Sequence, residues 1–423
     1  MSDTKIARVT GRRVWDSRGR PTVEAEVTLA GGASGRGIAP AGASTGSGEA
    51  VDLRDGGTAF GGYDVKKAVA AVTGEIARAL AGLDSMDQEA VDNTLIRLDG
   101  TETKSRLGGN ALIATSLAVA HAAAAAQGLP LWRHLAGGRT VRGMPRPEIQ
   151  LFGGGAHAGR RVDVQDFMVV ATLAGTFAEA LEMTAEVYGA AGKLLAKQGK
   201  LAGVADEGGY WPAFETNEET LGLAVAAIEA AGYRPGEDMA ISLDIAASDF
   251  GTAGRYRLGR DGRELDTDGM IGMLMDWLER YPIRWIEDPL AEDDEAGLVA
   301  FTQAAKGVRV VGDDYLVTNA ARIRHAAEVG ACNTALIKPN QAGTLTETKA
   351  AFDAARAVGW QAIVSARSGE TEDVSVTHLA VGWGAEMLKV GSFSRSERMA
   401  KWNEGLRIAE ALGDLPLVPL AGS

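Results

Sequence analysis

AISLD, at residues 240–244, is the first of six short apolar runs that each end at, or run into, a polar or charged side chain. The others are IRWIE (283–287), VRVVGD (308–313), TALIK (334–338), QAIVSA (361–366, followed by Arg367 and Ser368) and EMLK (386–389). Amphipathic stretches of helical period lie between the runs, as at 217–231, 268–281 and 345–358. This alternation is typical of a (β/α) barrel, whose chemistry lies at the carboxyl ends of its parallel strands.

The residues before this region follow a different pattern. TVEAEVTL at 22–29 alternates as a strand does, 35–40 continues it after a Gly-rich turn, and 63–80 and 107–127 have helical spacing. Strands followed by helices suggest a compact α+β unit. Gly137-Gly138 and the prolines at 145 and 147 punctuate the boundary. We therefore predict an α/β chain, with a smaller α+β domain at 1–140 and a (β/α)8 barrel at 141–423.

Composition excludes several classes of protein. Of 423 residues, 46% are hydrophobic and 23% charged, and the formal net charge of −13 argues against non-specific nucleic-acid binding. The one cysteine, Cys332, allows no disulfide within the chain. The N-terminus has no apolar signal region, and no run approaches the roughly 18 apolar residues of a membrane span. We expect a cytoplasmic protein with no membrane or nucleic-acid partner.

Three carboxylates end successive strands, and two lysines follow on later strands. Asp244, Glu287 and Asp313 would meet at the barrel mouth, where they repel one another unless a cation neutralises them, and hard oxygen ligands suit Mg²⁺. Lys338 and Lys389 would lie beside them, and a lysine near metal ions and a second lysine loses proton affinity. The set predicts removal of a proton alpha to a carboxylate, with a lysine as the base.

Three glycine-rich loops carry further candidates. DEGG at 206–209 holds Glu207, which could protonate a leaving group, although such a tetrapeptide is more often a simple turn. The loop at 153–159 holds His157, which we expect to be mobile, exposed and available for binding. PAGASTG at 40–46 offers the oxygens of Ser44 to metal or phosphate. Glycines would also let such loops close over a ligand.

Motifs along nearly the whole chain resemble those of the enolase family, the phosphopyruvate hydratases. The matching segments are DSRGRPTVE (16–24), GASTG (42–46), LRDG (53–56), LDGT (98–101), GAHAG (155–159), DEGG (206–209), LDIAASDF (243–250), IEDP (286–289), VGDD (311–314), KPNQAGTLT (338–346), RSGETED (367–373) and SRSERMAKWN (394–403). The number and order of these motifs make the resemblance specific. It implies a small α+β domain, a barrel with one antiparallel strand, and usually a homodimer.

The resemblance also implies the function of each site residue. Asp244, Glu287 and Asp313 match the ligands of one Mg²⁺, and Ser44 matches a residue that helps to bind a second. Lys338 matches the base, and Glu207 the acid that helps hydroxide to leave. The remaining matches all contact the substrate: Lys389 at its carboxylate, Arg367 and Ser368 at its phosphate, and His157 and Gln165 from the loop.

Several positions depart from the family pattern. Ala366 stands where enolases have histidine, and it can neither donate nor accept a proton. Asp166 replaces the glutamate that is paired with the catalytic acid, and a displacement of about 1 Å can cost about 10²-fold in rate. Gly153 replaces an asparagine, and Arg160 and Arg161 add charge after the histidine loop.

These departures leave three hypotheses for the function. The first is an enolase repurposed for phosphonate antibiotic biosynthesis, similar to carboxyphosphonoenolpyruvate synthases, with a nucleotide-activated phosphonoformate as second substrate that Arg160 and Arg161 would contact. The second is an ordinary enolase that converts 2-phosphoglycerate to phosphoenolpyruvate and water. The third is an inactive binding protein, against which the complete metal ligands and both lysines weigh. The first two share catalytic groups in Lys338, Glu207, Asp166 and Lys389.

Overall fold

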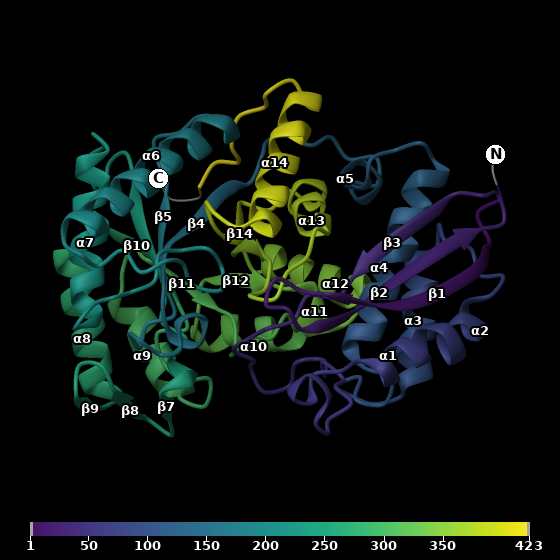
Figure 1. Cartoon of the computed structure of the whole chain (residues 1–423), viewed down its shortest axis with the longest axis horizontal. Coiled ribbons are helices and arrows are strands. Elements are labelled where there is room, and N and C mark those ends of the chain that lie inside the picture. The colour runs from purple at the N-terminus through teal and green to yellow at the C-terminus, as the bar shows by residue number, and fades with distance from the viewer. Residues whose placement is uncertain (1–2, 421–423) are drawn as a thin grey trace.

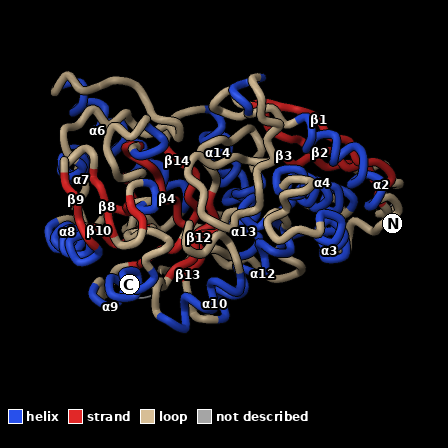
Figure 2. Tube along the Cα trace, turned by 90° about the horizontal axis from the view of Figure 1, so that it is seen from below, coloured by secondary structure: helices blue, strands red, loops and turns tan. Residues whose placement is uncertain are grey.

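The computed structural model describes residues 3–420 and places a three-stranded sheet with helices beside an eight-stranded barrel (Figure 1). The N-terminal sheet is an antiparallel meander of β1 (Ile6–Trp15), β2 (Pro21–Leu29) and β3 (Ser34–Ile38). Its helices are α1 (Lys66–Ala71), α2 (Ala77–Leu80), α3 (Gln88–Asp99), α4 (Gly109–Ala126) and α5 (Leu131–Leu135). In both Figures 1 and 2 the sheet and helices α2–α4 lie at one end of the molecule.

The alanine-rich helix α4 packs directly on the sheet. A side chain at Gly35 would lie 2.2 Å from the backbone nitrogen of Ala122, and one at Gly37 would lie 2.6 Å from the carbonyl of Ala114. Glycine on the strand and alanine on the helix thus allow a close approach of the two backbones. By length and composition α4 could cross a membrane, but 83% of it is buried inside the fold, as in a core helix.

The barrel closes in the order β10-β11-β12-β13-β14-β4-β5-β6. Its strands are β4 (Arg146–Gly153), β5 (Asp166–Val170), β6 (Ala240–Asp244), β10 (Ile283–Glu287), β11 (Arg309–Gly312), β12 (Thr334–Ile337), β13 (Gln361–Ser365) and β14 (Met387–Ser392). Strand β5 runs antiparallel to both neighbours, and the other pairs are parallel. The α/β barrel preceded by an α+β domain is therefore confirmed.

Helices surround the barrel. They are α6 (Phe177–Lys197), α7 (Asn217–Ala230), α8 (Thr267–Arg280), α9 (Glu295–Ala304), α10 (Ala320–Val329), α11 (Pro339–Ala342), α12 (Leu345–Ala357), α13 (Ser375–Trp383) and α14 (Ser396–Ala411). A short side sheet, β7 (Gly251–Thr252), β8 (Arg255–Leu258) and β9 (Arg263–Asp266), precedes α8. Several of these helices begin with a side-chain cap. The side chains of Thr176, Thr216 and Asp266 accept hydrogen bonds from backbone N–H groups in the first turns of α6, α7 and α8.

Two predicted elements differ from the structure. The expected helix at 63–80 begins only at Lys66, and a π-helical turn at Val72–Ile76 separates α1 from α2. The strand predicted to end at Lys389 continues to Ser392, because Gly391 and Ser392 still pair with β4 after a shift in register.

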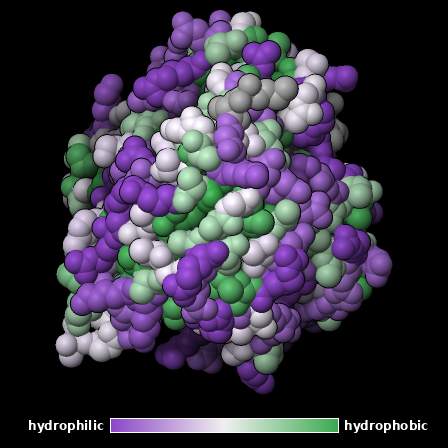
Figure 3. All heavy atoms as spheres, turned by 90° about the vertical axis from the view of Figure 1, so that its right-hand side faces the viewer, coloured by the Kyte–Doolittle hydropathy of each residue, from purple (hydrophilic) through white to green (hydrophobic). Residues whose placement is uncertain are grey.

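On the face shown in Figure 3, hydrophilic residues surround a smaller hydrophobic area near the centre.

Candidate active site at the barrel mouth

The predicted strand-end residues meet at one mouth of the barrel. Asp244 and Glu287 are the last residues of β6 and β10, and Asp313, Lys338 and Arg367 follow the ends of β11, β12 and β13 closely. Asp166 is the first residue of β5 and lies beside Asp244 in register. Because β5 runs antiparallel, its start is at the mouth, where the parallel strands end. All six side chains are buried.

Lys389 lies among the carboxylates. Its Nζ is 2.9 Å from Oδ2 of Asp244 and 2.7 Å from Oε2 of Glu287, with Oδ2 of Asp166 at 3.8 Å. Burial alone would lower the pKa of Lys389, but the charges of Asp244 and Glu287 outweigh it and raise the pKa well above its usual range. Gln165, predicted to contact substrate, donates its amide to the same Oδ2 of Asp244 at 2.9 Å.

Lys338 contacts Asp313 in a buried ion pair, and the other oxygen of Asp313 accepts from Gln341 at 2.9 Å. We expected bound metal ions and a second lysine to depress the pKa of Lys338, and with metal bound that remains a prediction; among the protein groups alone the shift is in the other direction. Burial does lower the pKa, but the charge of Asp313 overrides burial and raises it. The ammonium is thus held in place next to a predicted metal ligand.

The three predicted metal ligands have the chemistry of a hard-cation site. Oε1 of Glu287 is buried with no hydrogen-bond partner, and burial together with the charge of Asp244 raises the pKa of Glu287 well above its usual range. A divalent cation would offset both effects, so the residues fit Mg²⁺. In the described part of the chain, one predicted ligand also belongs to a compact acidic group, Asp288, Asp313 and Asp314, whose ligand atoms lie within 4.8 Å of one another. Lys389 separates Asp244 from Glu287.

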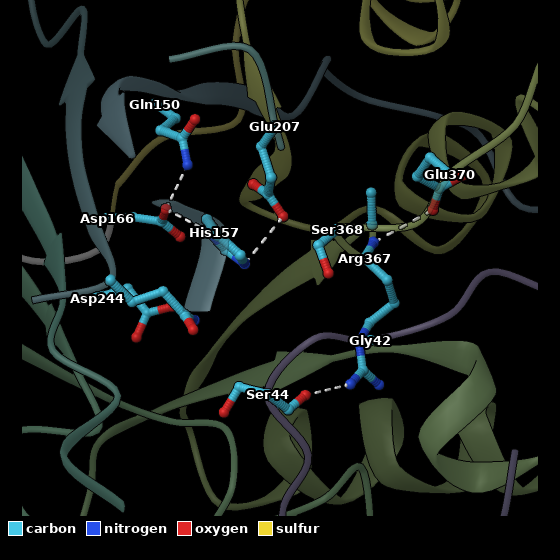
Figure 4. Close-up of polar contacts among 12 residues, drawn as sticks. Gly42, Ser44, Gln150, His157, Asp166, Glu207, Asp244, Arg367, Ser368 and Glu370 are labelled. Carbon is cyan, nitrogen blue, oxygen red and sulfur yellow. Dashed lines mark hydrogen bonds and ion pairs between the residues drawn. The ribbon is translucent and has the colours of Figure 1, made fainter. Parts of the chain in front are cut away.

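His157 is the centre of a second buried cluster (Figure 4). Its Nδ1 is 2.9 Å from Oδ1 of Asp166, and its Nε2 is 3.7 Å from Oε1 of Glu207. Burial alone would lower the pKa of His157, but the charges of Asp166 and Glu207 raise it to about 9. The expectation of an exposed histidine is wrong, since His157 is only 6% exposed in a 3-10 turn at Gly155–Ala158. Its mobility stays a prediction.

Arg367 and Ser368 lie on the opposite side of the mouth (Figure 4). Arg367 donates to the backbone carbonyl of Ser44 at 2.8 Å and to Oε2 of Glu49 at 2.9 Å. The Ser368 hydroxyl accepts from Arg18 at 3.3 Å. Ser44 donates its own hydroxyl to Asp249 at 3.2 Å. The loop at 40–46 is therefore tied to the predicted phosphate clamp by its backbone.

These groups enclose a small cavity. Its lining includes Ser44, His157, Glu207, Lys338 and Ala366, and its volume is about 20 Å³, room for about one water. Ala366 is buried and bonds through its backbone to Lys389. A phosphorylated three-carbon acid, which the resemblance implies as substrate, needs far more space, so its entry would require the loops to move.

Arg160 and Arg161 do not line this cavity. Arg160 donates to the carbonyl of Asp249 at 2.7 Å, and Arg161 is 3.4 Å from Glu215. Arg160 also lies 3.7 Å from the carboxylate of Asp249, which accepts from Ser44, so it reaches the edge of the mouth. Arg161 pairs with the exposed Glu215 on the outer surface.

Sequence reasoning missed several residues that shape the site. Glu49 pairs with Arg367, Arg18 with Ser368, Gln341 with Asp313 and Gln150 with Asp166. Arg18 and Gln341 lie within recognised motifs, at 16–24 and 338–346, and Glu49 follows the motif at 42–46, which was the available signal. Gln150 lies within β4, where all eight residues are buried and no alternation marks its inward side chain.

Acidic side chains and two buried lysines at the strand-end mouth are the residue types that barrel enzymes use when a lysine base and Mg²⁺ form an enolate. Two family models match the chain: the N-terminal domain of enolase over residues 6–135, and the C-terminal TIM barrel domain of enolase over 141–419. The chain is also 48% identical to Enolase 1 of Desulfitobacterium hafniense (strain Y51), over 100% of this chain and 97% of that protein. This chain therefore belongs to the enolase family.

Proposed function

We propose that this protein is an ordinary enolase, which converts 2-phosphoglycerate to phosphoenolpyruvate and water. The observation that carries the proposal is the arrangement at the mouth, where Lys338 and Lys389 each contact a carboxylate from the predicted metal set. Full-length identity of 48% to an Enolase 1 supports the same choice. The comparisons give no support to the phosphonate-pathway hypothesis or to a nucleotide-activated second substrate.

Different residues at the mouth would serve proton removal, substrate binding and loss of hydroxide. Lys338 would take the proton from C2, and Lys389 would hold the substrate carboxylate. Arg367 and Ser368 would bind the phosphate, with Ser44 beside them. Glu207, 3.7 Å from His157, would give a proton to the departing hydroxyl. A base and an acid that line the same cavity match an elimination that removes hydrogen and hydroxide from adjacent carbons.

Asp244, Glu287 and Asp313 would hold Mg²⁺, and we propose a second ion near Ser44. The bound metal supplies positive charge next to the substrate carboxylate, which carries an extra negative charge once the proton is lost. The chain contributes the rest, because Lys389 and Gln165 fix the orientation of Asp244, and Gln341 fixes that of Asp313.

The test is a phosphorus NMR time course with Mg²⁺ and 2-phosphoglycerate. We expect phosphoenolpyruvate to appear at a rate proportional to enzyme concentration and to stop on addition of EDTA. Substrate that binds but stays unconverted would refute the proposal.

The homodimer and the domain boundary near residue 140 remain predictions. Size-exclusion chromatography would test the first, and limited proteolysis the second.

A further inference from the structure

Gln150 connects the two groups on the leaving-hydroxyl side. It lies on β4, is 1% exposed, and donates its amide to Oδ1 of Asp166, the oxygen that also contacts His157. Its amide oxygen accepts from the backbone nitrogen of Gly209 at 2.8 Å. Gly209 belongs to the loop that carries Glu207. One side chain therefore bridges the partner of the imidazole and the backbone of the acid loop.

The chemistry of its neighbours fixes which way the amide points. The N–H of Gly209 can only donate, so it requires the amide oxygen, and the carboxylate of Asp166 accepts from the NH₂. Two glycines leave room for this side chain. A Cβ at Gly209 would lie 2.5 Å from Oε1 of Gln150, and one at Gly153 would lie 3.3 Å from its Nε2 and 2.6 Å from Cβ of Ala205.

The same packing explains Gly153, which departs from the asparagine of the family. A larger side chain there would collide with Ala205 and crowd the amide of Gln150. Gly153 also lies beside Asp166 in the register of β4 and β5. The departures at 153 and 166 are therefore parts of one local arrangement around Gln150.

We propose that Gln150 is a positioning residue, which acts through Asp166 to hold His157 beside Glu207. The inference rests on the proposed dehydration of 2-phosphoglycerate. Ala366 offers no group for proton transfer, so His157 is the imidazole that the structure places next to the acid. Among the described residues, the Gln150 side chain bonds to Asp166 and Gly209 and to neither Lys338 nor Lys389, so it should affect loss of hydroxide and spare removal of the C2 proton.

The experiment compares two rates in Gln150→Asn and Gln150→Glu. The first shortens the bridge by one methylene, and the second replaces the donor by a carboxylate facing Asp166. Displacements of about 1 Å cost about 10²-fold, so we expect kcat for dehydration to fall about that much with KM nearly unchanged. Exchange of the C2 proton with deuterium from solvent, followed by proton NMR, should persist.

Gln361→Asn is the matched control, since Gln361 is also a buried glutamine of a barrel strand, at the start of β13. It should leave both rates unchanged. The double variant Gln150→Asn/Asp166→Glu moves one methylene across the same hydrogen bond and should recover most of the lost kcat. Parallel loss of exchange and dehydration, or no rescue in the double variant, would overturn the proposal.

A measurement without substrate separates this inference from the proposed function. The imidazole of His157 should show a slowly exchanging Nδ1 proton bonded to Asp166, assigned by its loss in His157→Gln. That resonance should broaden or vanish in Gln150→Asn. An unchanged resonance would contradict the positioning by Gln150. If the wild-type protein does not dehydrate 2-phosphoglycerate, the proposed function fails while this resonance still decides the inference.

Discussion

Replacing Ala366 by histidine restores the family residue, and from sequence alone that change should raise dehydration. The structure predicts the opposite. The cavity that Ala366 lines is about 20 Å³, which is room for about one water and not for an imidazole. Overpacking a filled interior typically costs about 1–3 kcal/mol. We expect Ala366→His to lose that much free energy of unfolding and to gain no activity.

The reason for expecting no gain is that an imidazole is already present. His157 is 3.7 Å from Glu207, and Asp166 holds it there. A second ring from position 366 would have to displace one of these groups from the cavity. Ala366→Ser is the control, because a hydroxyl is close to the size of the water that fits there, and its stability should stay near wild type.

The assay is urea unfolding of both variants without ligand, together with the rate of phosphoenolpyruvate formation. A histidine variant as stable as wild type would show that the loops at 40–46 and 153–159 give way easily. A histidine variant with a higher kcat would refute the argument that His157 already supplies the imidazole.

Three further predictions concern buried charges. Lys338→Ala should reduce C2 exchange by about 10²–10⁴-fold, as expected for loss of a general base, while calorimetry still detects Mg²⁺ binding; retained exchange would exclude Lys338 as the base. Lys389→Met breaks the contacts of Lys389 with Glu287 and Asp244 and should lower the free energy of unfolding by about 3–5 kcal/mol. Saturating Mg²⁺ should restore part of that loss. The pKa of His157 is raised to about 9, so its stabilisation is full below pH 6.5 and lost as the pH rises to 9; the stability gap to His157→Gln should shrink over that interval, and a constant gap would contradict the shift.

The part of the site that lies at parallel strand ends could be predicted from the sequence. Asp244 and Glu287 close apolar runs, and the barrel brings such ends together whatever the details of packing. Asp166 could not be placed this way, because it begins a strand, and only the antiparallel direction of β5 brings it to the mouth. Strand direction is a property of the assembled sheet, so the resemblance was the only guide.

Motifs marked some of the loops that carry distant partners, but one sequence could not show which residues pair. Arg367 and Glu49 are 318 residues apart and meet only when the N-terminal loops cover the barrel. His157 looked mobile because glycines surround it, yet Gly153 and Gly155 allow close packing against Gln150 and Gln165. The glycine content of this loop therefore did not predict how deeply the loop is buried.

Stability alone does not account for the charges at the mouth. Buried ion pairs are usually no more stabilising than well-packed apolar residues, because desolvation offsets their attraction. Lys389 nevertheless lies 2.9 Å from Asp244 and 2.7 Å from Glu287. It lines the cavity of about 20 Å³. Such an arrangement is useful where charge must develop away from water, since each contact is then strong and already oriented. Under the proposed function, the loop around Ser44 would open to admit the substrate and close before Lys338 removes its proton, so both proposed catalytic groups would depend on loop closure.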